Sequence, residues 1–203
     1  MCTTHSPTEA FQGFPRQDRP VHGGTFVKHG MYTARIGERL HYEFAGQYEG
    51  IELLYDHGRK GSHIAVPFLG RRSSTASSLS HADIVVLDKR KKPEKAIVVC
   101  EIEEGHAEPK RIIGDICNVL LARKLRALGS DYSLLGCTVI LGVKTEPEGM
   151  SEAKARRLVK AILRMAKSEV LQRKRITLVC ASDFGTLERR VRRAILRSVA
   201  RVV

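Results

Sequence analysis

The chain lacks several features that mark particular classes of protein. Its 203 residues contain no Trp, and aromatic residues make up only 5% of them. No apolar run approaches the length needed to cross a membrane, and the sequence begins without the charged-then-apolar pattern of a secretory signal. We therefore expect a cytoplasmic protein that makes no contact with a membrane.

Disulfide and zinc frameworks are missing as well. The five cysteines include no Cys-x-x-Cys pair, and four of them lie inside apolar runs. They are Cys2, Cys100, Cys117, Cys137 and Cys180. This pattern is typical of small buried thiols in a reducing compartment.

The motifs of several common enzyme classes do not occur. The sequence contains no Gly-x-Ser-x-Gly, no phosphate-binding loop with Gly-Lys-Ser/Thr, no His-Glu-x-x-His and no dinucleotide-binding glycine pattern. It therefore gives no support to the nucleophilic, nucleotide-binding and zinc chemistries that these motifs indicate.

What the sequence does contain is an excess of positive charge, +13 in all. Residues 151–203 hold 15 Lys and Arg against 4 Asp and Glu, whereas residues 1–150 hold 20 against 18. A basic field of this kind concentrates polyanions, and nucleic acid is the commonest of them. The alternative is a solvated basic surface that only aids solubility.

The distribution of apolar residues predicts the organisation of the chain. Residues 1–25 carry scattered Pro and Gly and are expected to form a flexible arm, and residues 26–203 a single domain with basic C-terminal helices. Helices are expected at about 27–48, 107–128, 151–171 and from 186 onward, and strands at 64–69, 83–88, 96–103, 137–143 and 176–181. The segment 51–55 fits either a strand or a helix end. This order predicts an α/β protein in which helices cover both faces of a central mixed sheet, giving three α/β/α layers.

Three carboxylates interrupt the apolar strands at 83–88 and 96–103. Asp83 stands where the first strand begins, and Glu101 and Glu103 stand where the second ends. Side chains alternate across a strand, so Glu101 and Glu103 share one face, and in an antiparallel hairpin Asp83 can lie beside them. Clustered carboxylates repel one another unless a cation is present, and Mg²⁺ is the hard divalent ion that prefers oxygen ligands.

Other residues around these acids have more than one interpretation. Glu43 projects from the buried stripe of the first helix, so it either joins the carboxylates or reaches water at the edge of the stripe. Asp115 is expected at the edge of its helix, paired with Arg111. The three strand acids could instead form an exposed strand end facing Lys89 or Lys91 across the hairpin, in which case no metal site exists.

Asp83, a spacer, and Glu101-x-Glu103 followed by a helix resemble the PD-(D/E)xK nuclease superfamily, and the order of elements from about 34 to 181 is similar to that superfamily's common core. The resemblance implies a restriction-endonuclease-like fold with Asp83 and Glu101 as metal ligands. Ala82 stands where the motif has Pro, and Glu103 stands where it has Lys. Some type II restriction endonucleases are similar in carrying Glu at that position.

The resemblance also implies roles for further residues. Glu103 would orient or deprotonate the attacking water, and Lys110 is the nearest candidate for a Lys that has migrated to the following helix. Glu43 would match the extra acid that many members carry on the first helix and would be a third metal ligand.

The function implied is a Mg²⁺-dependent DNA endonuclease that hydrolyses phosphodiester bonds, and a restriction enzyme of type II would act as a homodimer. The loop arginines Arg71 and Arg72 and the last-helix arginines Arg189, Arg193 and Arg197 are expected to contact phosphates. The alternative is a non-catalytic nucleic-acid-binding protein on the same fold, whose active site has decayed at Glu103. A third interpretation is a module whose basic helices bind an acidic protein.

Overall fold

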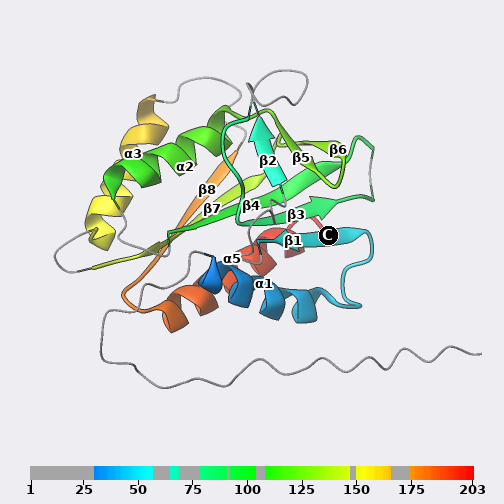
Figure 1. Cartoon of the computed structure of the whole chain (residues 1–203), viewed down its shortest axis with the longest axis horizontal. Coiled ribbons are helices and arrows are strands. Elements are labelled where there is room, and N and C mark those ends of the chain that lie inside the picture. The colour runs from blue at the N-terminus through cyan, green and yellow to red at the C-terminus, as the bar shows by residue number, and fades with distance from the viewer. Residues whose placement is uncertain are drawn as a thin grey trace, which may run out of the picture.

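The computed structural model describes residues 30–56, 65–68, 78–90, 92–103, 108–146, 150–165 and 174–203. The expected arm at 1–25 and the loop arginines Arg71 and Arg72 lie outside these ranges. The described part is a mixed α/β structure in which helices lie on both faces of a sheet (Figure 1). No helix in it is long and apolar enough to span a membrane.

Five strands form the central sheet in the order β1–β3–β4–β7–β8. Their bounds are β1 Ile51–Tyr55, β3 Ile84–Asp88, β4 Lys95–Glu103, β7 Thr138–Lys144 and β8 Arg175–Ala181. β1, β3 and β4 pair antiparallel, which confirms the predicted hairpin, whereas β4, β7 and β8 pair parallel. Parallel neighbours need crossover connections, and the helices between these strands are part of those connections.

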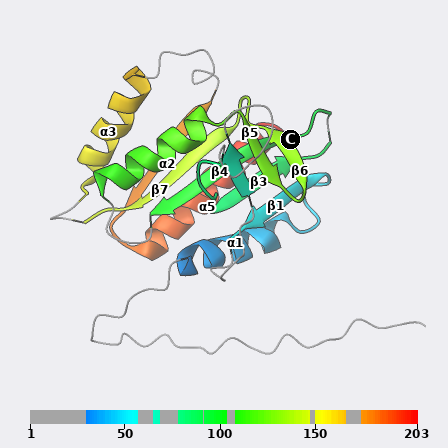
Figure 2. The ribbon, with the colours of Figure 1, turned by 45° about the horizontal axis from the view of Figure 1, so that its top comes forward.

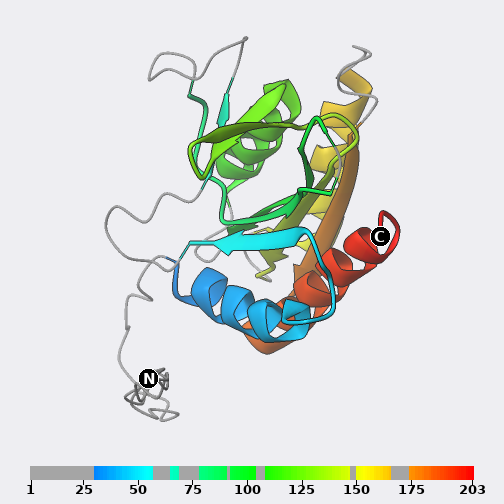
Figure 3. The same ribbon diagram turned by 90° about the vertical axis from the view of Figure 1, so that its right-hand side faces the viewer.

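The four described helices divide between the two faces of the sheet (Figure 3). They are α1 Met31–Phe44, α2 Pro109–Leu121, α3 Glu152–Met165 and α5 Phe184–Ala200. α1 and α5 pack on one face with Cys100 and Ile102 of β4, and α2 and α3 pack on the other with Leu141 and Val143 of β7. Because side chains alternate along β4, Glu101 and Glu103 point toward α2, away from α1 and α5.

The predicted helix starts are largely confirmed. Ser151 Oγ accepts a hydrogen bond from Lys154 N (3.2 Å) at the start of α3, as expected of a helix cap. The last helix begins at Phe184, two residues before the expected Thr186, because Asp183 accepts a hydrogen bond from Thr186 N (2.8 Å) and caps it. The cysteines that the structure describes carry free thiols, as expected.

The prediction of a helix over 107–128 is wrong beyond Leu121. α2 ends at Leu121, and the chain continues into a hairpin of β5 (Lys124–Ala127) and β6 (Ser130–Ser133), which β2 (Ala65–Phe68) extends on one side (Figure 2). Leu128 and Gly129 both have positive φ, 49° and 76°, as a two-residue hairpin turn requires. Gly129 therefore serves this turn, and it does not end the helix.

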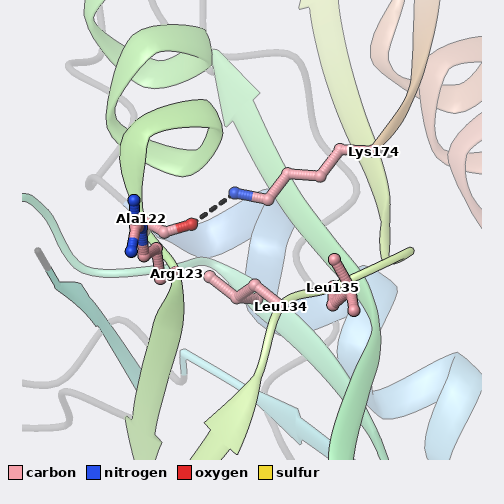
Figure 4. Close-up of a pocket in the computed structure, with 5 residues that line it drawn as sticks. All are labelled: Ala122, Arg123, Leu134, Leu135 and Lys174. Atoms are coloured by element: carbon pink, nitrogen blue, oxygen red, sulfur yellow. Dashed lines mark hydrogen bonds between the residues drawn. The ribbon is translucent and has the colours of Figure 1, made fainter. Parts of the chain in front are cut away.

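The C-terminus of α2 is held by a buried lysine (Figure 4). Lys174 is only 7% exposed, and its Nζ donates hydrogen bonds to the carbonyls of Val119 (2.6 Å), Leu120 (2.9 Å) and Ala122. Its burial lowers the pKa of the ammonium to about 8. The side chain lines a pocket of ≈ 260 Å³ with Ala122, Arg123, Leu134 and Leu135. The last carbonyls of a helix have no partner within the helix, so Lys174 satisfies groups that would otherwise be buried and unpaired.

We expect Lys174→Met to lower the free energy of unfolding by about 1–3 kcal/mol, because it leaves buried carbonyls without a donor. Urea denaturation measures this change. Lys160→Met, at an exposed position on α3, is the matched control and is expected to change stability by less than about 0.5 kcal/mol. Equal stabilities for the two variants would contradict the capping role.

Candidate functional site

Asp83 and Glu101 lie side by side where β3 begins and β4 nears its end. Ile84 pairs with Cys100 in the antiparallel register, so Asp83, one residue earlier, lies beside Glu101. The Asp83 carboxylate also accepts a hydrogen bond from the backbone N–H of Ile102 (2.6 Å). This bond fixes Asp83 against β4 and brings two carboxylates together on the α2 face of the sheet.

Glu101 is an unusual buried acid. The residue is 7% exposed, and its Oε1 is buried with no hydrogen-bond partner among the described residues. Burial raises the pKa of Glu101 well above its ordinary range, and the negative charges of Asp83, Asp115 and Glu103 raise it further. A buried carboxyl oxygen without a donor costs free energy, so a structure that retains one usually has a reason for it.

Glu103 and Asp115 form a second carboxyl pair next to Glu101. The Glu103 side chain is 13% exposed and hydrogen-bonded to Asp115 of α2. Burial raises the pKa of Glu103 to about 8, and the hydrogen bond and charge of Asp115 add to this effect. Burial also raises the pKa of Asp115, while the hydrogen bond from Glu103 opposes that rise. Glu103 therefore carries the proton that the pair shares.

Asp115 is the site residue whose role the sequence analysis missed. It was expected at the helix edge, paired with Arg111. The charge of Arg111 does oppose the rise in the pKa of Asp115 that burial causes, but Arg111 Nη1 lies 4.0 Å from Glu103 Oε2. The signal was available, because Asp115 lies three residues after Ile112 and four before Val119, both fully buried. That spacing puts Asp115 on the inward stripe of α2.

The structure does not bring Glu43 to the carboxylates. Glu43 pairs with Arg192 of α5, on the opposite face of the sheet. It belongs to an ion-pair network between α1 and α5, in which Arg35 (3.1 Å) and Arg39 (2.6 Å) hold the buried carboxylate of Glu188. The expectation that Glu43 is a metal ligand is therefore wrong, and Asp115 is the helix acid at the site.

Lys110 does not reach the carboxylates either. Its side chain is 81% exposed and pairs with Glu108 (3.1 Å). The alternative in which the strand acids face Lys89 is also wrong, because Lys89 pairs with Glu52 of β1. Lys91, the other lysine of that alternative, lies outside the described residues. Among the described residues, Arg111 is the cation that lies beside the cluster.

The predicted phosphate contacts of the last helix lie away from the acids. Arg189, Arg193 and Arg197 are exposed on α5 and, with Arg201 just beyond it, form the surface that we call the α5 ridge. α5 packs on the sheet face opposite α2, so the ridge and the carboxylates do not share a surface. The basic helix on the carboxylate side is α3, where Lys154, Arg157 and Lys160 are exposed (Figure 3).

The donor set fits a hard divalent cation in its chemistry. Within the described ranges no three His, Cys, Asp or Glu side chains are already arranged to hold a metal ion, and Glu103 and Asp115 share a proton instead. The cluster nevertheless consists of carboxylate oxygens, the ligands that Mg²⁺ prefers. The unpartnered oxygen of Glu101 is the atom that a cation would satisfy.

Comparison with known proteins adds no family assignment. No protein-family model, curated protein or solved structure matches the chain. The functional argument therefore depends on the geometry and electrostatics of the carboxylates themselves.

The shared proton predicts that stability depends on pH. The pKa of Glu103 is about 8 in the folded protein and about 4.5 in the unfolded chain, so the folded state binds the additional proton between these values. Stability then falls as pH rises through this window. In EDTA, we expect the free energy of unfolding, from urea titrations, to fall by about 3–4 kcal/mol between pH 5 and pH 8.5.

Glu103→Gln keeps a neutral hydrogen-bonding side chain and is expected to show a shallower decline with pH. Glu49→Gln, in the exposed connection after α1, is the control and is expected to decline as the wild type does. A wild-type profile as shallow as that of Glu103→Gln would contradict the shared proton.

Proposed function

We propose that this protein is a Mg²⁺-dependent DNA endonuclease that hydrolyses phosphodiester bonds. The observation that carries the proposal is the buried Glu101 beside Asp83, with a carboxyl oxygen that has no hydrogen-bond partner among the described residues. The order of elements supports it, because α1, the antiparallel strands β1, β3 and β4, α2 and the parallel strand β7 come in the order of the restriction-endonuclease-like fold. β2 and the β5–β6 hairpin are insertions in this order. Asp83 and Glu101 then correspond to the acids of the PD-(D/E)xK motif.

Each residue of the cluster has a role in this proposal. Asp83 and Glu101 would hold Mg²⁺, which when bound lowers the pKa of a water and stabilises charge on the phosphate. Glu103 would accept the proton of the attacking water after losing the proton that it shares with Asp115, and its pKa of about 8 is close to the pH at which it would act. Asp115 orients Glu103 through their hydrogen bond, and the exposed guanidinium of Arg111 is available to a phosphate oxygen.

Exposed cations on the α2 side of the sheet favour a polyanionic substrate. Lys154, Arg157 and Lys160 of α3 are exposed on the same side of the sheet as α2. Such cations bind phosphates and position a duplex without reading its sequence. A homodimer that places two such sites on a palindrome is the form that a type II restriction enzyme would take.

The second candidate is a nucleic-acid-binding protein without catalysis. Glu103 stands where the superfamily carries Lys, and Lys110 pairs with Glu108 away from the acids. Among the described residues, the cation beside the acids is therefore Arg111, and no lysine takes the place of the motif's Lys. The lack of that lysine favours the non-catalytic candidate.

Asp83→Asn and Glu101→Gln are expected to reduce Mg²⁺-dependent cleavage of plasmid DNA by more than about 100-fold. Each variant replaces a negatively charged metal ligand with a neutral amide of similar shape. Gel electrophoresis of the products gives the rate. Asp131→Asn, which breaks an ion pair with Arg126 on the β5–β6 hairpin, is the control and is expected to cleave at the wild-type rate. Cleavage retained by both site variants would refute the assignment.

Mg²⁺ is also expected to raise the melting temperature of the wild type, and to do so more at pH 8.5 than at pH 6. A ligand of the folded state stabilises it by mass action, and at low pH protons on Glu101 and Glu103 compete with the ion. Glu101→Gln is expected to lose the effect. Salt-sensitive DNA binding without any stabilisation by Mg²⁺ or Mn²⁺ would favour the non-catalytic candidate.

A further inference from the structure

We propose that the α5 ridge binds a second DNA duplex, separate from the one that lies at the carboxylate cluster. The inference rests on the proposed function only for the identity of the first duplex. It gives a role to the positive charge on the side of the sheet opposite the acids.

The ridge is a row of exposed arginines, whose first member, Arg189, interacts electrostatically with Asp183. Arg189, Arg193, Arg197 and Arg201 follow one another at intervals of four residues, and all are exposed. Leu187, Val191 and Ile195 bury the opposite side of the helix. Among the described residues, no carboxylate pairs with Arg193 or Arg197, and Arg189 donates a hydrogen bond only to the hydroxyl of Thr186 (2.9 Å). The line is about 18 Å long at 1.5 Å per residue, enough to follow several phosphates.

The acid nearest to the ridge in the chain does not neutralise it. Glu188 is 4% exposed and turns toward α1, where Arg35 and Arg39 bind it. The side chains of these two arginines remain about half exposed, at 55% and 47%. They therefore extend the positive surface from α5 onto α1.

The sheet separates this surface from the carboxylates. Val191 of α5 packs so closely on β7 that a Cβ added at Gly142 would lie 3.0 Å from its Cγ2. Glu101 points to the other face, where α2 covers it. Between the outer surfaces of α3 and α5 lie two helix layers, each about 10 Å across, with the sheet between them. A straight duplex that contacts the acids and α3 cannot also lie along the ridge.

The chemistry of the ridge favours a phosphate backbone over other acidic partners. It is made of arginine alone, whose planar guanidinium binds a phosphate through two parallel hydrogen bonds. Among the described residues, α5 exposes no large apolar side chain, whereas a helix that inserts into a membrane surface needs an apolar face beside its basic one. Successive ridge residues are also about 6 Å apart along the helix axis, and this regular spacing suits the regularly repeated charge of a phosphate backbone.

Bridging of two duplexes tests the inference. The full-length wild type in EDTA is mixed with a biotinylated 25-bp duplex and a fluorescent 25-bp duplex, and the fluorescence retained on streptavidin beads is measured. The α5 variant Arg189→Gln/Arg193→Gln/Arg197→Gln and the α3 variant Lys154→Gln/Arg157→Gln/Lys160→Gln remove equal charge from opposite faces. We expect the wild type to retain the fluorescent duplex, and both variants to fall to the level of beads without protein while each still binds one duplex.

Three results would overturn the inference: no bridging by the wild type, undiminished bridging by the α5 variant, or loss of all duplex binding by that variant. Pelleting with anionic phospholipid vesicles and binding to polyglutamate are measured in parallel. A loss by the α5 variant in either of these, with bridging unchanged, would assign the ridge to a membrane or an acidic protein. Bridging without Mg²⁺-dependent cleavage would refute the proposed nuclease and leave this inference standing.

Discussion

The burial of β4 on both faces is the constraint on which the rest of the structure depends. The strand lies between β3 and β7 in the sheet and between two helix layers, so nearly every side chain that it carries is buried. A strand in that position is usually apolar throughout. Glu101 and Glu103 break the rule on one face only, while Cys100 and Ile102 keep it on the other. The buried carboxylates of β4 therefore all lie on the side of the sheet that α2 covers.

The surroundings of a buried acid differ between the two faces of the sheet. On the α1–α5 side, Glu188 is as inaccessible as Glu101 but lies within reach of Arg35 and Arg39, which satisfy its charge. On the α2 side, Glu101 has other acids around it, and Arg111 acts only on the outer pair, Glu103 and Asp115. Removing one partner of a buried ion pair is strongly destabilising, so the first arrangement has a structural purpose. The second stores unfavourable electrostatic energy, which is typical of sites that bind a ligand.

Much of this organisation could be predicted from the sequence because it follows from local patterns. Alternation placed Glu101 and Glu103 on one face, and the short polar link predicted the β3–β4 hairpin that brings Asp83 beside them. The predictions that were wrong depended on which helix covers which face of the sheet, and local patterns do not show this. Glu43 and Asp115 both lie on inward stripes, and only the packing of α1 and α2 on opposite faces shows that Asp115 is the one at the site. The β5–β6 hairpin was missed because Leu128-Gly129 lacks the usual turn residues and Gly129 also fits a helix end.

The buried lysine at the end of α2 has a consequence for the carboxylates. Lys174 belongs to the segment just before β8, yet it fixes the last turn of α2, and Asp115 lies only four residues before Val119, the first carbonyl that it binds. Four residues correspond to about 6 Å along the helix axis. Lys174 thus helps to fix the axial position and rotation of α2 over the sheet. The alignment of Asp115 with Glu103 therefore depends on Lys174, although Lys174 contacts neither of them.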